Sequence, residues 1–547
     1  MDLVPVSTRL VSLLLLAAPA VAAQTLRDHG TIVIVMGAEP NTPIPTLAGF
    51  KQNQDVADLL FLRLAHPGRA LNTAVEKEFV PELARSWQRR DPLTLVFELD
   101  PRAHWHDGHP VTARDVVWSI DRARDSTVNA QYALLLRQIA SVTAEGDRRV
   151  VFRFRRAYPE QLYDATWHVQ PLPAHLVDTV PRTGLAGSAF VRQPIGNGPY
   201  RFGRRDPGRQ LELVADTGFF LGRPRLERVV FLVVREAEAQ LNLVLDGTAD
   251  ALEAITPVSN IPRITANPAL RIATVPSFSV GYLLFNLRAA GDRSKPHPIL
   301  ADPDVRRAIA MAIDRERIVR ATFGPYAATA EAPLGQGHWL RREAPHGARY
   351  DPAAARGLLE RKGWVDRDSD GYRERAGVPL LLRLSLPGTS AVRVTLAAQI
   401  QEMLRQVGIR LELVRLEGPV WFERRNRGEF DIDFSSATLD PTPSGMVQSW
   451  SCAGLSGANV GQYCNPVFDS LLTTAIALGE VTARWQAALR VLQTDAPAVF
   501  LYSPLNAVAV HTRYRDVTLR PESLWADLWR WSVEPTRRLP RDDLVGR

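Results

Sequence analysis

An alternation of strand-like and helix-like patterns in the C-terminal half constrains the fold more than any other feature. We predict strands at "PLLLRLSL" (379–386), "IRLELVRL" (409–416) and "EFDIDFSS" (429–436), whose apolar residues run together or alternate over strand length. A helix with one apolar face (391–407) separates the first two strands, and a shorter helix around Trp421 separates the last two. Strands joined through helices pair in parallel or mixed sheets with right-handed crossovers, so we predict an α/β fold.

Two further helices in this half carry the same start signal. In "ADPDVRRAIAMAIDRERIV", Asp302 is predicted as the N-cap and Pro303 as the first helical residue. In "YDPAAARGLLERKGW", Asp351 and Pro352 repeat the pair, and Gly363 is predicted as the stop.

The first 23 residues form a separate segment. Arg9 precedes "LVSLLLLAAPAVAAQ", a short apolar run that ends in small residues, and Val21 and Ala23 suit a secretory cleavage site before Gln24. A buried N-terminal helix is the alternative. No cysteine follows the cleavage site, so no lipid anchor is expected there. We therefore predict a signal peptide (1–23) and a free, exported mature chain.

Charge and cysteine usage bear on partners. The net charge is +7, but only four of the 66 basic residues are lysines and the arginines are scattered, which predicts a solvated surface rather than a nucleic-acid site. Cys452 and Cys464 lie close together in a chain predicted to be exported, which predicts one disulfide closing a short loop. A pair of metal ligands is the alternative.

Two loops leave carboxyl ends of the predicted strands, where ligands collect in open α/β sheets. The loop 387–390 offers hydroxyls and backbone N–H groups, and it opens the helix that carries Arg393, so it suits an anion. The loop 435–441 offers further hydroxyls and the carboxylate of Asp440. Both loops could also be ordinary polar connections.

Two motifs suggest metal binding. "DRDSDGYRERAG" (366–377) has acids at positions 1, 3 and 5 of an EF-hand loop, but position 12 is Gly377 instead of the required glutamate, so we predict a tight solvated turn. "HWHDGH" packs His104, His106 and His109 together, and here we predict a hydrogen-bonded turn rather than a metal site. No motif demands nucleophilic or acid/base catalysis, so we predict no enzyme and no cofactor.

Several stretches, taken in order, resemble the periplasmic solute-binding proteins of the dipeptide/oligopeptide/nickel class, the receptors of ABC importers. The stretches are "FVPELARSW" (79–87), "FELDPRAHWHDGHPVTARDVVWSIDRARD" (97–125), "PIGNGPYRF" (194–202), "LLFNLRA" (283–289), "DVRRAIAMAIDRERIV" (304–319), "YDPAAARGLLERKGW" (350–364), "DRDSDGYRERAGVPL" (366–380) and "CAGLSGANVGQYCNPVFDSLL" (452–472). They span nearly the whole mature chain. The resemblance also supports the Cys452–Cys464 disulfide.

The resemblance implies a type II periplasmic-binding-protein fold, or Venus flytrap, with two lobes, an extra inserted subdomain and mixed sheets flanked by helices. The expected boundaries are 24–46, 186–285 and 506–547 for lobe 1 (domain I), 47–185 for the inserted subdomain (domain II) and 286–505 for lobe 2 (domain III). A ligand closed between the lobes would be handed to the permease of an ABC importer in the inner membrane. We expect a monomer.

The resemblance leaves the ligand open. Peptide receptors of this class place an aspartate three residues before a "DP"-like pair to hold the peptide ammonium, and here that position is Ala437. Either Asp440 replaces it, or the ligand is no simple peptide. The predicted ligand-binding residues are Gly388, Thr389, Ser390, Arg393, Ser436, Ala437, Thr438 and Asp440. The function expected is capture of a peptide or peptide-like solute; the alternatives are a metal-chelate receptor, an extracellular hydrolase and a periplasmic chaperone or scaffold.

Overall fold

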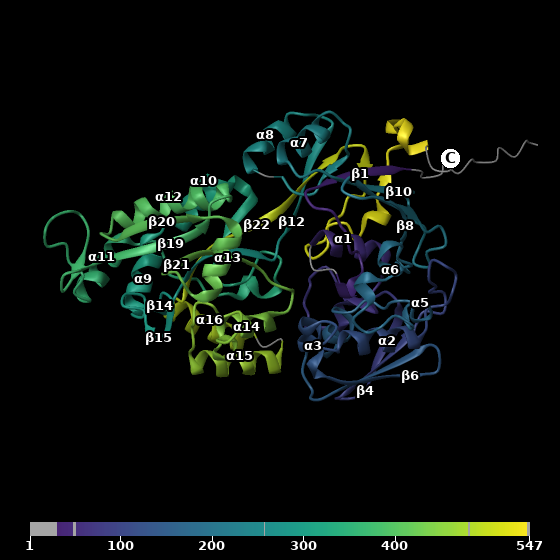
Figure 1. The fold of residues 1–547 in the computed structure, drawn as a ribbon, viewed down its shortest axis with the longest axis horizontal. Helices are drawn as coiled ribbons and strands as arrows, with labels where there is room; N and C mark the ends of the chain where they lie inside the picture. Colours follow the sequence, from purple (N-terminus) through teal and green to yellow (C-terminus); the bar gives the residue numbers. More distant parts are fainter. Residues whose placement is uncertain (1–29, 48–50, 256, 480–481, 544–547) are drawn as a thin grey trace, which may run out of the picture.

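The computed structural model describes residues 30–47, 51–255, 257–479 and 482–543. The chain folds into two masses (Figure 1): lobe 2 on one side, and lobe 1 with the inserted subdomain on the other. The predicted signal peptide lies outside the described residues. Within those residues, none of the helices combines the length and apolar character needed to cross a bilayer.

Lobe 2 contains the predicted alternation of strands and helices. Its elements are β19 (Leu381–Pro387), α12 (Ala391–Arg405), β20 (Arg410–Leu416), α13 (Gly418–Arg427) and β21 (Ile432–Thr438). β19 pairs in parallel with both β20 and β21, while β13 (Ser279–Phe285) pairs antiparallel with β21. The sheet is therefore mixed, as the sequence predicts. Apolar residues of β19 and α12 pack together beneath it, including Leu384, Ile400 and Leu404.

The remaining helices of lobe 2 cover this sheet. They are α9 (Pro303–Ala312), α10 (Arg315–Phe323), α11 (Pro352–Arg361), α14 (Met446–Trp450), α15 (Pro466–Leu478) and α16 (Thr482–Asp495). Both predicted caps are confirmed: Asp302 accepts a hydrogen bond from the Asp304 amide, and Asp351 from the Ala354 amide. The predicted disulfide between Cys452 and Cys464 is present and closes the loop between α14 and α15.

Lobe 1 is built on a sheet with both strand orientations. Its strands are β1 (Thr31–Met36), β8 (Tyr200–Asp206), β9 (Gln210–Ala215), β10 (Arg228–Val233), β11 (Ala251–Leu252) and β12 (Leu270–Pro276). β1 pairs in parallel with β10 and β11, and β9 pairs antiparallel with β8 and β10. The buried Arg513 guanidinium bonds both Asp250 and Asp542, which fastens the C-terminal segment to this sheet.

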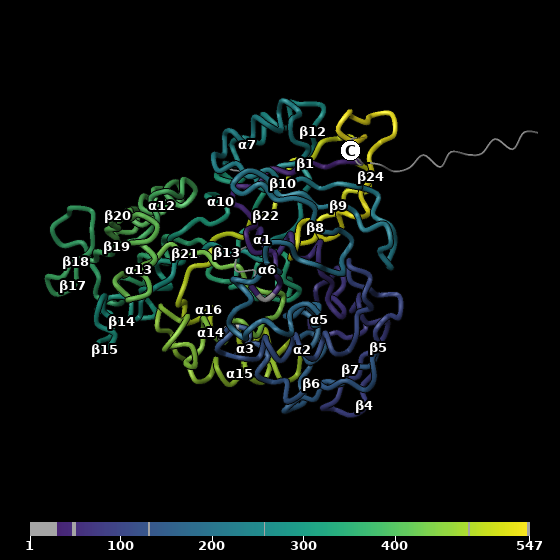
Figure 2. The backbone as a smooth tube through the Cα atoms, turned by 45° about the vertical axis from the view of Figure 1, so that its right-hand side comes forward, coloured from purple at the N-terminus to yellow at the C-terminus, as the bar shows by residue number. Residues whose placement is uncertain are grey.

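One long strand, β22 (Ala498–His511), runs through both lobes (Figures 1 and 2). Its first part pairs with β13 and β16 (Ala327–Thr329), and its second part pairs with β11 and β12. The chain thus enters lobe 2 between β12 and β13. β13 belongs to the lobe 2 sheet, although the predicted boundary at 285 puts it in lobe 1. The remaining boundaries stay predictions.

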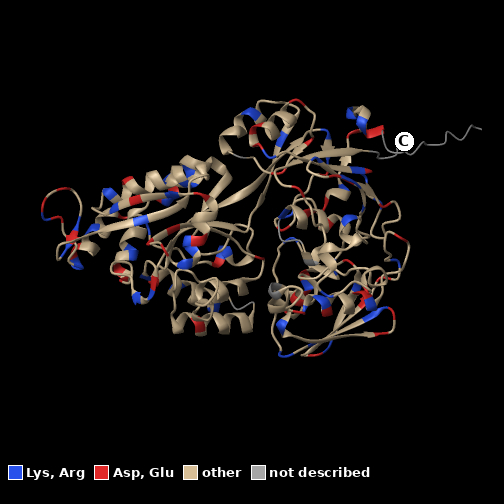
Figure 3. Cartoon of the chain, in the orientation of Figure 1, with Lys and Arg blue, Asp and Glu red and all other residues tan. Residues whose placement is uncertain are grey.

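The inserted subdomain has its own antiparallel sheet in the order β4-β5-β7-β6. The strands are β4 (Ala84–Asp91), β5 (Thr94–Leu99), β6 (Ile139–Glu145) and β7 (Arg149–Phe154), and the helices are α2 (Ala113–Ala123), α3 (Ala130–Leu135), α4 (Gln161–Thr166) and α5 (Ala174–Val177). α1 (Lys51–Leu60) precedes this sheet. Figure 3 shows acidic and basic residues interspersed in both masses of the molecule.

The two metal-like motifs form turns. Asp366 and Asp368 accept hydrogen bonds from the Gly371 and Asp370 amides, so these carboxylates cap their own turn. His106 accepts at Nδ1 from the Gly196 amide, and its Nε2 lies 3.0 Å from the carbonyl oxygen of Gly198. Burial lowers the pKa of His106 to about 4, which fits this neutral, structural role.

Candidate functional site

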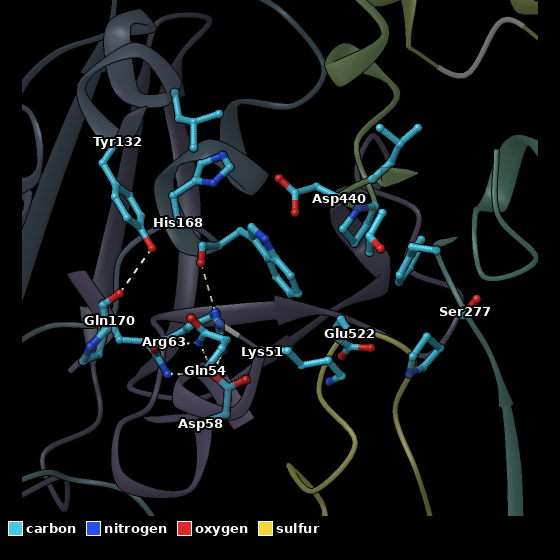
Figure 4. A pocket seen from close by; sticks show the side chains of 18 of the residues that line it. Lys51, Gln54, Asp58, Arg63, Tyr132, His168, Gln170, Ser277, Asp440 and Glu522 are labelled. Carbon is cyan, nitrogen blue, oxygen red and sulfur yellow. Dashed lines mark hydrogen bonds and ion pairs between the residues drawn. The ribbon is translucent and has the colours of Figure 1, made fainter. Parts of the chain in front are cut away.

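A cavity of about 390 Å³ lies where the two lobes and the inserted subdomain meet (Figure 4). It is bounded by α1 and the segment after it, by α3 and the segment 167–170, by the entry into lobe 2 at 277–279, and by the loop after β21. Its polar lining consists of Lys51, Gln54, Asp58, Arg63, Asn129, Tyr132, His168, Gln170, Ser277, Ser279, Thr438, Asp440, Asn506 and Glu522. A solute in this cavity would contact both lobes at once.

Most charged groups of the lining are already paired. Arg63 lies 2.7 Å from the Asp58 carboxylate, and Lys51 lies 2.9 Å from the carboxylate of Asp55. Glu522 forms an ion pair with a neighbouring arginine. Burial alone would raise the pKa of Asp58. The positive charge of Arg63 and the hydrogen bonds that Asp58 accepts outweigh burial and hold this pKa below its ordinary value. Within each of these pairs the two charges neutralise each other.

Asp440 differs from the other cavity acids. In the part of the chain that the structure describes, its carboxylate forms no hydrogen bond or ion pair, and the residue is exposed. It projects from the loop after β21 toward the wall that carries His168 (Figure 4). Burial raises the pKa of Tyr132, the positive charge of Arg63 opposes this rise, and the negative charge of Asp440 adds to it. The lining therefore has one uncompensated negative charge.

The opposite wall comes from the inserted subdomain. Tyr132 donates to the Pro45 carbonyl at 3.2 Å, and Gln170 donates to the Asp58 carboxylate at 3.0 Å. His168 Nε2 lies 3.4 Å from an oxygen of Asp164. These contacts fix the polar groups in place before any solute enters.

The predicted site residues fall into two groups. Thr438 and Asp440 line the cavity, and the Thr438 hydroxyl lies 2.7 Å from that of Ser279. The other predicted residues are absent from the lining of this cavity as described: Gly388, Thr389, Ser390, Arg393, Ser436 and Ala437. Arg393 instead donates to the Ser436 hydroxyl at 2.5 Å and lies over the Trp421 ring, 5.2 Å from its centroid. The ligand-binding role of this second group stays a prediction.

The lobes also touch beside the cavity. Glu160 of the inserted subdomain accepts hydrogen bonds from the hydroxyls of Thr442 (2.9 Å) and Ser444 (2.7 Å) in lobe 2, and from that of Thr73 (2.5 Å). Burial raises the pKa of Glu160 despite these three donors. A β-carbon on Gly479 of lobe 2 would meet Pro159 at 2.6 Å. The inserted subdomain and lobe 2 are therefore in direct contact on this side of the cavity.

Sequence reasoning missed the cavity wall opposite Asp440. Lys51, Arg63, Tyr132, His168 and Gln170 belong to no local motif, and they lie far from lobe 2 in the sequence. The one available signal was the implied Venus-flytrap fold, which requires a second wall without naming its residues.

Comparison with known proteins identifies the fold and the family. The family described as bacterial extracellular solute-binding proteins, family 5 Middle, matches residues 78–457. The chain belongs to this family. The family consists of solute-binding receptors, and the match covers most of the inserted subdomain, the lobe 1 segment 186–285, and lobe 2 as far as the disulfide loop.

Relatives of this family 5 receptor cover nearly its whole length. The oligopeptide-binding protein AppA of Bacillus subtilis is 24% identical over 526 residues, 92% of each chain. The peptide transport periplasmic protein SapA of Salmonella typhimurium is 26% identical over 536 residues, 91% of each chain.

Solved structures confirm the predicted fold. AppA in complex with a nonapeptide superposes with a TM-score of 0.74, at 23% identity over 92% of this chain and 99% of that chain. NikZ from Campylobacter jejuni in complex with Ni(L-His) superposes with a TM-score of 0.76, at 23% identity over the same shares. The type II periplasmic-binding-protein fold predicted from the resemblance is therefore correct.

Proposed function

We propose that this receptor captures a peptide or peptide-like solute with a free ammonium group and delivers it to an ABC importer in the inner membrane. The unpaired carboxylate of Asp440 in the inter-lobe cavity is the observation that carries this proposal. A cationic group of the ligand supplies the missing partner, because the exposed carboxylate faces the cavity without a counter-charge and a charge-assisted hydrogen bond is stronger than a neutral one. In peptide receptors of the class, an aspartate at the position that corresponds to Ala437 holds the peptide ammonium. In this view Asp440 takes over that role.

Closure is the mechanism. A ligand that contacts Asp440 of lobe 2 and the wall around Tyr132 and Lys51 binds the closed state better than the open one, so it shifts the population toward closure. The hydrogen bonds of Glu160 to Thr442 and Ser444 add stability to the same state without touching the ligand. The permease would then recognise the closed pair of lobes on a free periplasmic chain.

The proposal is tested by calorimetry with matched short peptides. Trialanine and its N-acetyl derivative differ in the ammonium group and share every other contact. We expect binding of short peptides with a free N-terminus, loss of binding on acetylation, and loss of this discrimination in Asp440→Asn. Asp368→Asn, an exposed acid in the turn of lobe 2, is the control. Equal affinity for free and acetylated peptides, or unchanged discrimination in Asp440→Asn, would contradict the proposal.

A metal chelate is the second candidate ligand. His168 lines the cavity and offers an imidazole nitrogen, which suits nickel and other late transition metals. NikZ, one of the structural neighbours, holds Ni(L-His). Native mass spectrometry of protein purified without chelator separates the two ligands, because a bound chelate has a metal isotope pattern that a peptide lacks. The two candidates share the cavity and the closure mechanism.

A further inference from the structure

Three side chains with metal-ligand chemistry meet on the inserted subdomain, outside the inter-lobe cavity. Asp107 and His109 come from the turn between β5 and α2, and His175 comes from α5. None of the three belongs to the cavity lining described above. The sequence motif "HWHDGH" held two of these residues, but the third is 66 positions away from His109.

The distances between these groups suit one small cation. His175 Nε2 lies 2.8 Å from Asp107 Oδ2, and His109 Nδ1 lies 3.3 Å from Asp107 Oδ1. One ligand atom from each residue lies within 4.8 Å of the other two, and the imidazole rings are 4.3 Å apart at their centroids. Zinc bonds of about 2.0–2.2 Å place two tetrahedral ligands roughly 3.3–3.6 Å apart. The distance from His109 to Asp107 thus matches this spacing, and the shorter contact of His175 with Asp107 must lengthen when an ion binds.

The backbone fixes the turn that carries two of the ligands. Gly108 has φ +90°, a left-handed conformation that glycine adopts without strain. Its amide donates to the Trp105 carbonyl at 2.8 Å, and the Trp105 amide donates to the His109 carbonyl at 2.7 Å. The Trp105 side chain is fully buried, so it anchors this turn in the core.

One buried acid joins the turn to the helix of the third ligand. Asp115 accepts from the Trp105 indole N–H at 3.3 Å and from the Ala174 amide, at the start of α5, at 2.8 Å. The position of His175 relative to Asp107 is therefore set by the folded subdomain and does not depend on flexible side chains alone. A site held by such a scaffold loses little entropy when an ion binds.

The chemistry of the cluster also suits a cation. It offers one carboxylate and two imidazoles, a ligand set of the kind that zinc binds, and imidazole also suits copper and nickel. The His109 side chain is 63% exposed, which leaves one side of the cluster open to solvent.

We propose that Asp107, His109 and His175 bind one divalent late transition-metal cation, with Zn²⁺ as the expected ion. On binding, each imidazole takes the neutral tautomer protonated at its other ring nitrogen, so that His175 Nε2 and His109 Nδ1 exchange their contacts with Asp107 for bonds to the metal. Water fills the fourth position on the open side. This site goes beyond the proposed function, because it lies outside the solute cavity and needs no solute.

The test is calorimetric titration of ZnCl₂ into untagged, chelator-stripped protein in a buffer that does not coordinate metals. We expect one Zn²⁺ per chain in the wild type. The double variant His109→Ala/His175→Ala should bind Zn²⁺ at least about tenfold more weakly than the wild type. Asp107→Asn should also weaken Zn²⁺ binding, but by less. His104→Ala is the matched control, because His104 lies 3.8 Å from Asp216 and belongs to neither of the groups of potential metal ligands found among the described residues.

Further measurements separate the loss of the metal site from unfolding and from metal binding elsewhere. Circular dichroism must match between the variants and the wild type, and Co²⁺ substituted for Zn²⁺ should give the visible absorption of tetrahedral coordination only when both histidines are present. Asp440→Ala, which changes the solute cavity, should leave Zn²⁺ binding unchanged. The proposal is overturned if the wild type binds no Zn²⁺, if the double variant binds like the wild type, or if Asp440→Ala abolishes binding.

Discussion

Two polar regions at the end of β21 differ in how their charges are satisfied. The Arg393 guanidinium is hydrogen-bonded to Ser436 and lies over Trp421, all within lobe 2. The Asp440 carboxylate, a few residues further along, has no partner in the described part of the chain and faces the opposite lobe. An unpaired charge at a strand end is therefore a stronger candidate for a ligand contact than a charge that its own lobe already pairs, and the proposed function rests on Asp440 for this reason.

Replacing Asp440 should have the largest effect. We expect Asp440→Ala to weaken binding of a free-amine peptide about 10- to 100-fold, because one charge-assisted hydrogen bond is lost. Isothermal calorimetry with the wild type and the variant measures this change. Unchanged affinity would remove the contrast between the two regions.

Replacing Glu160 tests whether peptide binding depends on the contact between the inserted subdomain and lobe 2. Glu160→Ala removes both hydrogen bonds to lobe 2, so we expect roughly 5- to 10-fold weaker peptide binding, mainly through faster dissociation. Stopped-flow fluorescence measures the dissociation rate. Glu316→Ala, an exposed acid on α10, serves as the control. An equal effect of the control would mean that the loss is not specific to the contact between the lobes.

The buried carboxyl group of Glu253, near Lys51, should make the stability of the folded protein depend on pH. Burial, and then the charge of Asp55, raise the pKa of Glu253 to about 7 from an ordinary 4.5. The stabilising contribution of this group is therefore complete below pH 4.5 and is lost as the pH rises through about 7. Between pH 5.5 and 8 we expect Tm to fall less in Glu253→Gln than in the wild type, by on the order of 2 °C. Differential scanning calorimetry measures both slopes, and identical slopes would contradict this assignment.

Replacing Arg393 should have the smallest effect. Its contacts stay within lobe 2, so we expect Arg393→Ala to change peptide affinity by less than about threefold, within the range of a lost exposed contact. The same calorimetric series measures it. A tenfold loss would instead favour the anion-binding role predicted for the loop 387–390 and would extend the ligand beyond the cavity.

The sequence predicted the architecture of lobe 2 well, for local reasons. Strand and helix periods differ, and caps such as Asp302 and Asp351 mark where helices begin. It placed Thr438 and Asp440 at a strand end, and the fold brings that end to the cavity. The facing wall could not be predicted in this way, because Tyr132 and Lys51 are joined to Asp440 only by the closure of the two lobes. His175 joins Asp107 and His109 across a similar gap in sequence, and no local pattern announces it.

The long strand β22 has a consequence for engineering the molecule. Lobe 2 is one uninterrupted piece of chain between the end of β12 and the middle of β22, and its two ends are neighbours, since Pro276 pairs with Leu505. A piece of chain whose ends are adjacent can be excised and its ends rejoined, or given new termini in an exposed turn such as 366–371. A fluorescent protein grafted at such a turn would report the proposed closure of the lobes as a change in fluorescence.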